Sequence, residues 1–145
     1  MIAAVLALLL LASVASVTLT IDRMNRDLSQ RYAAMDTGYW IVDFISETEG
    51  NWPESWGALE QHATSSDRNA NRDFNWFQEN VNVNWEVDVD KLREAESPDS
   101  PPYPVVTTKD NVMAGPTWTH EANRNIWLAF NNGKELPPPS DTMPR

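Results

Sequence analysis

The chain has 145 residues, a formal net charge of −10 and no cysteine. An acidic surface of this kind disfavours binding to nucleic acid and to anionic lipid head groups. The missing thiols exclude disulfides, thiolate catalysis and cysteine-ligated zinc or iron–sulfur centres, and the length allows one small domain after an N-terminal segment.

Residues 2–21 form an apolar segment that contains no charge, no proline and no glycine. A helix of about twenty residues spans about 30 Å, which is the hydrocarbon thickness of a lipid bilayer. We therefore predict that residues 1–21 anchor the protein in a bilayer. The predicted anchor side chains are Ile2, Val5, Leu8, Leu11, Val14, Val17 and Ile21.

The alternative interpretation of this segment is a cleaved signal peptide, because Ser13 and Ala15 are small residues suitably placed before Ser16. No Lys or Arg precedes Arg23, and the lack of a basic start favours an uncleaved anchor. Three arginines soon after the segment would keep the following domain in the cytoplasm, but long domains translocate with little regard to charge. We expect an extracytoplasmic domain, in the periplasm or at the cell surface.

A helical apolar pattern continues through residues 22–50. Apolar residues recur there at alternating spacings of four and three: Leu28, Tyr32, Met35, Tyr39 and Val42. This spacing predicts an amphipathic helix whose apolar stripe faces helices of other membrane proteins or of a second copy. Gly38 weakens the helix locally, and Gly50 supplies the expected end. One helix from about residue 3 to residue 49 would form the spine of the domain.

Residues 51–135 are expected to form a small head domain. Pro53 suits the first position of a short helix, residues 62–73 have the composition of a loop, and Asp73 is suited to cap a short helical turn. Apolar and polar residues then alternate without error over residues 81–90, which predicts a half-buried strand.

The last part of the head is less regular. Residues 91–96 suit one helical turn, and residues 103–108 suit a second strand. Residues 119–130 fit a helical stripe, yet their second half also fits a strand. The proline-rich residues 136–145 predict a disordered tail. The predicted fold class is α+β, with a long N-terminal helix packed against a small head that contains β-structure.

Seven tryptophans in a chain of this size require an explanation. Large aromatic side chains bury much apolar area, so a core or interface role is the first interpretation. The second interpretation is an aromatic platform that stacks on sugar rings, with Trp52 and Trp56 as its best candidates. An extracytoplasmic carbohydrate-binding module is therefore the alternative function, with a glycan as the ligand.

The sequence contains no recognisable catalytic, cofactor or metal site. Glu86, Asp88 and Asp90 share one face of the predicted strand, but calcium would need a loop with a sharp glycine turn, so we interpret them as a solvated face. His120 begins a zincin-like motif whose second histidine is replaced by Arg124. We expect no cofactor and no enzymatic activity.

The order of features resembles type IV pilins and type II secretion pseudopilins, which join a hydrophobic helix, an amphipathic continuation and a small β-containing head. The turn from Gly50 to Pro53 is similar to turns common in that family, whereas Val5 stands where pilin-like proteins usually carry glutamate. The turn around Trp52 and Trp56 also resembles that of short single-anchor proteins of planctomycetes. These resemblances imply a membrane-anchored structural or interaction protein, pilin-like or a small subunit of a cell-envelope complex.

Overall fold

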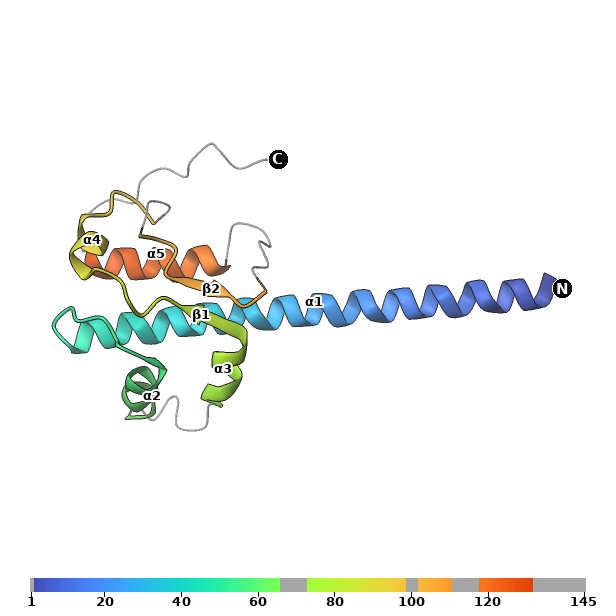
Figure 1. Ribbon diagram of the computed structural model, residues 1–145, viewed down its shortest axis with the longest axis horizontal. Helices are drawn as coiled ribbons and strands as arrows, with labels where there is room; N and C mark the ends of the chain where they lie inside the picture. The colour runs from blue at the N-terminus through green and yellow to red at the C-terminus, as the bar shows by residue number, and fades with distance from the viewer. Residues whose placement is uncertain (1, 66–72, 99–101, 111–117, 132–145) are drawn as a thin grey trace.

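The computed structural model describes residues 2–65, 73–98, 102–110 and 118–131. The long helix α1 (Ile2–Glu47) carries a small head on its C-terminal half, and its N-terminal half projects from that head (Figure 1). This arrangement confirms the expected long helix packed on a small mixed head. The other described elements are α2 (Trp56–Ser65), α3 (Phe74–Asn80), β1 (Val81–Val83), α4 (Val89–Glu94), β2 (Val106–Thr108) and α5 (Trp118–Phe130).

Helix α1 ends as the sequence predicts. Glu49 and Gly50 both adopt positive φ angles, of 59° and 88°, and the Gly50 N–H donates to the Ile45 carbonyl at 2.9 Å. This is the left-handed helix end for which glycine is the favoured residue. A guanidinium group adds to it, because Nη2 of Arg93 on α4 donates to the Gly50 carbonyl at 3.1 Å. A positive charge at a helix C-terminus is favourable to the helix dipole.

The start of α2 differs from the prediction. The helix begins at Trp56 rather than at Pro53, because the Ser55 hydroxyl accepts a hydrogen bond from the Ala58 N–H at 3.3 Å and caps it. The helix also extends to Ser65, into the residues expected to form a loop. Asp73, in contrast, caps α3 as predicted, since its carboxylate accepts from the Asn75 and Trp76 N–H groups.

The predicted strand over residues 81–90 is wrong beyond Val83. Only three residues pair, antiparallel to β2, in the register Val81↔Thr108, Asn82↔Thr107 and Val83↔Val106. The Asp88 carboxylate instead accepts hydrogen bonds from the Asp90 and Lys91 N–H groups, which begins α4. Local capping therefore competes with strand pairing.

The alternation of burial nevertheless continues through residues 81–90, so the pattern identified the inward side chains correctly. Glu86, Asp88 and Asp90 are all exposed, as expected, although they do not lie on a strand face. The second predicted strand, residues 103–108, is shorter than expected, because only its last three residues form β2. The predicted tail, residues 136–145, lies outside the described residues.

The ambiguous residues 119–130 are helical, and α5 is the principal partner of α1 (Figure 1). Ala122 and Ile126 are buried on the shared face. A Cβ atom on Gly38 would lie 2.6 Å from the Cβ of Ala122, closer than two carbon atoms can approach. The glycine predicted only to weaken α1 is thus the residue that allows α5 to pack closely against it.

A buried asparagine joins α5 to the sheet. Oδ1 of Asn123 accepts from the N–H groups of Val105 and Val106 at 2.7 and 3.0 Å, and its Nδ2 donates to the Val106 carbonyl at 2.8 Å. These backbone groups lie on the edge of β2 that β1 does not cover. The side chain satisfies polar groups that would otherwise be buried without partners.

Aromatic side chains fill the core, which supports the first interpretation of the tryptophans. Trp40 on α1 packs against Phe74 and Phe77 of α3, with ring centroids 4.8 and 4.5 Å away. Trp127 on α5 is also buried, and its indole N–H donates to the Ala95 carbonyl at 2.8 Å. The core therefore lies between the C-terminal half of α1 and the short elements around it.

Candidate interaction surface on the long helix

The projecting half of α1 carries uncovered apolar side chains. Leu11 is 67% exposed, Leu19 is 70% exposed and Met24 is 64% exposed, and these residues point to different sides of the helix. Of the predicted anchor residues, Leu11, Val14, Val17 and Ile21 are all exposed on this half. The side chains of Ile2, Val5 and Leu8 lie outside the described part of the structure.

Two threonine side chains on this half form hydrogen bonds within the helix. The Thr18 hydroxyl donates to the Val14 carbonyl at 3.0 Å, and the Thr20 hydroxyl donates to the Ser16 carbonyl at 2.9 Å. Hydroxyls bonded back to the preceding turn present little unsatisfied polarity to an apolar environment. The surface of α1 between Leu11 and Ile21 is therefore mainly apolar.

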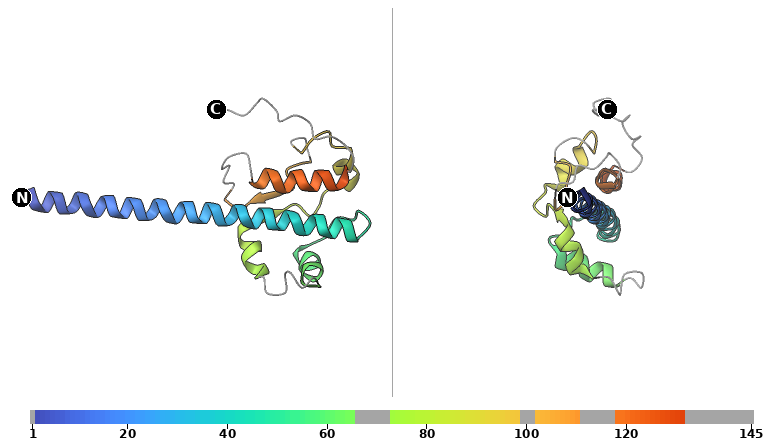
Figure 2. Two further views of the ribbon diagram at one scale, coloured as in Figure 1. Left: turned by 180° about the vertical axis from the view of Figure 1, so that it is seen from behind. Right: turned by 90° about the vertical axis from the view of Figure 1, so that its right-hand side faces the viewer.

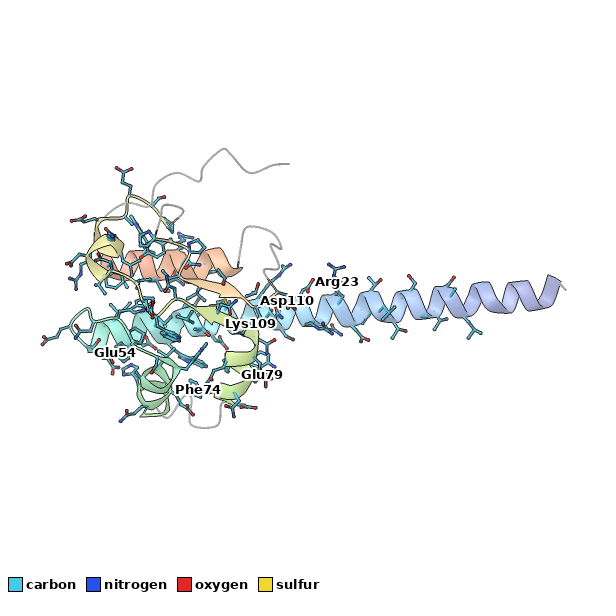
Figure 3. All side chains as sticks on the ribbon, viewed as in Figure 1. Arg23, Glu54, Phe74, Glu79, Lys109 and Asp110 are labelled. Atoms are coloured by element: carbon cyan, nitrogen blue, oxygen red, sulfur yellow. The ribbon has the colours of Figure 1, made fainter. Side chains whose placement is uncertain are left out.

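The head begins abruptly along α1. Nε2 of Gln30, which is buried, donates to Oδ2 of Asp110 in the turn after β2 at 2.9 Å. Arg23 lies on the part of α1 that projects beyond this contact (Figure 3). The first charged residues after the apolar segment therefore lie between that segment and the head.

The half of α1 within the head has a buried face and an open face. Ala34, Thr37 and Ile41 are fully buried on one side. On the other side Leu28, Tyr32 and Tyr39 are each about 45% exposed. Figure 2 shows the described elements of the head gathered around part of the circumference of α1, and none of these elements covers the remaining side.

The predicted stripe therefore lies largely on the open face. Its other members, Met35 and Val42, are half-buried, and Val42 packs partly against the core. The prediction began the stripe at Leu28, but the same spacing of four and three extends back towards the N-terminus through Asn25 and Ile21. The signal was present in the sequence and was hidden by the overall apolarity of residues 2–21.

The proposed sugar platform does not fit the positions of its two tryptophans. Trp52 is only 8% exposed and packs near Phe130, with 6.5 Å between ring centroids. Trp56 is half-buried and meets Trp85 edge to face at 5.4 Å. Stacking on a sugar needs an open ring face, so the expectation that Trp52 is exposed is wrong.

In the described ranges no three His, Cys, Asp or Glu side chains gather closely enough to hold a metal ion. Among the residues whose side chains the structure describes, which begin at Leu11 in α1, no helix has both the length and the apolar character that the crossing of a membrane requires.

The chain therefore consists of a small head on the C-terminal half of a long helix, with one side of that helix open in the described part of the structure. The chain matches no protein-family model, no curated protein and no solved structure. The resemblance to pilins and pseudopilins stays a prediction.

Proposed function

We propose that this protein is a single-pass membrane-anchored structural or interaction protein, pilin-like or a small subunit of a cell-envelope complex. The observation that carries the proposal is the exposure of Leu11, Val14 and Val17 on a half of α1 that the head does not cover. Soluble monomers rarely leave a contiguous apolar surface of such extent in water. A lipid bilayer and the helices of neighbouring proteins are the environments in which it is stable.

The division of α1 supports the same proposal. Residues 2–21 contain no charge, and the charged residues Asp22, Arg23, Arg26 and Asp27 follow directly, where the polar surface of a membrane would begin. The head is assembled entirely from residues after this boundary in the described ranges. Its role in the proposal is to present the open face of α1 at a fixed distance from the bilayer, on the extracytoplasmic side.

Washing membranes with alkaline carbonate tests the anchor. The full chain is expected to remain in the membrane pellet, and Leu11→Arg is expected to lower the retained fraction, because arginine at the centre of an apolar segment costs about 3 kcal/mol. Leu11→Met is the matched control and should behave as the native chain. Recovery of the native chain in the supernatant would contradict the proposal.

The side of the membrane on which the head lies needs a separate test. In intact cells, a membrane-impermeant thiol reagent should label Lys109→Cys on the exposed turn, and labelling only after lysis would contradict the extracytoplasmic placement.

A further inference from the structure

A continuous line of residues follows one side of α1 with alternating spacings of three and four. We call this line the seam, and it consists of Leu11, Val14, Thr18, Ile21, Asn25, Leu28, Tyr32, Met35, Tyr39 and Val42. All its members are apolar or aromatic except Thr18 and Asn25. A seam of this period sustained over about four heptads is long enough for a stable coiled coil.

The seam differs from the rest of the helix surface in the half of α1 that lies within the head. Among the described side chains of α1 beyond Asn25, the large apolar ones that are exposed are Leu28, Tyr32 and Tyr39, and all of them lie on the seam. The head packs on other faces of the same helix, through residues such as Ala34 and Ile41. A partner helix along the seam would therefore run beside α1 without displacing α5.

We propose that the occupant of the seam is the seam of a second copy of this chain, in a parallel two-stranded coiled coil. The inference rests on the proposed function, because two copies anchored in one bilayer by residues 2–21 have parallel helices. In this pairing each Asn25 lies opposite Asn25 of the second copy at an equivalent core position. A buried asparagine at one core position is a device by which parallel coiled coils specify register and two strands.

Charge complementarity also favours a second copy. Arg31 and Asp36 flank the seam on opposite sides and are five residues apart. In a parallel coiled coil in register, this spacing brings the flanking residue of one helix close to the flanking residue of the other. Arg31 of one copy then approaches Asp36 of the second copy, and the symmetric pair forms at the same time. An antiparallel pairing would not align these positions or the two Asn25 side chains.

Cysteine cross-linking tests the inference directly, because the native chain contains no cysteine. Leu28→Cys places a thiol on the seam, and Arg23→Cys places one on the side of α1 away from the seam; both positions are exposed. After oxidation of native membranes, the seam variant is expected to give at least about ten times more covalent homodimer than the control, because a disulfide requires Cβ atoms about 4 Å apart. Equal yields, no product, or a cross-link from Leu28→Cys to a different protein would overturn the inference.

A second pair of variants tests the role assigned to Asn25. Asn25→Leu should convert a single dimeric species into a mixture that includes higher oligomers, whereas Arg26→Leu, one residue on and outside the seam, should leave the dimer unchanged. An unchanged dimer in Asn25→Leu would overturn the assigned register. A carbonate wash of the same samples separates the two proposals. Retention in the pellet without homodimer refutes the coiled coil alone, and loss from the pellet refutes the anchor.

Discussion

Gly38 sets the distance between α1 and α5. Its hydrogen atom occupies the place where a Cβ would approach Ala122 to 2.6 Å, with the Ala122 Cα only 2.8 Å away. Glycine lowers the stability of a helix by about 1 kcal/mol relative to alanine, so Gly38 makes α1 less stable as an isolated helix. The contact with α5 requires glycine at this position. The close approach in turn buries Ala122, Ile126 and Trp127 against the head.

Alanine substitution at two glycines tests this interpretation. Gly38→Ala should lower the free energy of unfolding by about 1–3 kcal/mol, because overpacking outweighs the gain in helix propensity. Gly57→Ala in α2 is the matched control: its added Cβ would meet only the Ser55 hydroxyl at 3.7 Å, so stability should rise by up to about 1 kcal/mol. Thermal unfolding of the full chain in mild detergent measures both. Equal effects at the two sites would rule out close packing at Gly38.

Tyr103 provides a pH-dependent test of the core. It is buried, its hydroxyl has no hydrogen-bond partner among the described residues, and burial raises the pKa of Tyr103 above the ordinary tyrosine value. In the unfolded chain the phenol ionises near pH 10, whereas in the folded protein it stays protonated. Unfolding therefore releases a proton above about pH 10, and stability is present below that pH and falls as pH rises through it.

We expect Tyr103→Phe to leave stability at neutral pH unchanged or to raise it by about 1 kcal/mol, because it removes a buried hydroxyl without a partner. The variant should also lose less stability between about pH 9 and pH 11 than the native chain. Tyr39→Phe, at an exposed position, is the control and should show the native pH dependence. Melting temperatures followed by circular dichroism across this range provide the measurement. A Tyr103→Phe profile that falls as steeply as the native one would show that Tyr103 is not the group that titrates.

At the level of elements, one side chain of α5 replaces a missing strand. The short sheet has a free edge on β2, and Asn123 makes three hydrogen bonds to the backbone of Val105 and Val106 there. Two strands of three residues would be marginal alone. Their stability therefore depends on α5, which is itself held on α1 by the contact at Gly38.

Removal of this side chain should be costly. Asn123→Ala leaves buried backbone groups without partners, and we expect a loss of about 3 kcal/mol of unfolding free energy. Asn125→Ala, at a half-buried position of the same helix, should change it by less than about 1 kcal/mol. Chemical denaturation of both variants at equal detergent concentration distinguishes them. A loss at Asn123 no larger than that at Asn125 would mean that the edge of β2 is satisfied in another way.

The elements differ in how far the sequence predicts them, and the reasons are physical. Helix α1 was predictable because its apolar period and its glycine end are local signals. The predicted strand over residues 81–90 was too long. An alternation of apolar and polar residues shows which side chains are buried, but the helix cap at Asp88 determines that the backbone turns into α4. Residues 119–130 stayed ambiguous because the choice depends on Gly38, more than eighty residues earlier in the chain. The sequence predicted only the part of the seam from Leu28 onwards. Its outer part lies within residues 2–21, where nearly all residues are apolar and no face of the helix stands out.

Over the whole molecule, α1 has two environments. Its C-terminal half is the spine of the head, and its N-terminal half extends about 30 Å or more beyond it at 1.5 Å per residue (Figure 2). The acidic charge of the chain lies entirely after the apolar segment, with Asp22 as its first member. In the proposed function, this distribution would keep the head soluble at the membrane surface while the apolar segment lies in the bilayer.

The proposed function places the projecting half of α1 in a lipid bilayer, and spin-label accessibility along α1 measures this placement. Cysteine introduced singly at Val17, Leu19 and Arg23, which lie outside the seam, would carry the label on the full chain in lipid vesicles. Labels at Val17 and Leu19 are expected to collide with dissolved oxygen and to be shielded from a water-soluble nickel complex, and the label at Arg23 is expected to show the reverse. Equal access of the nickel complex at all three positions would contradict this placement.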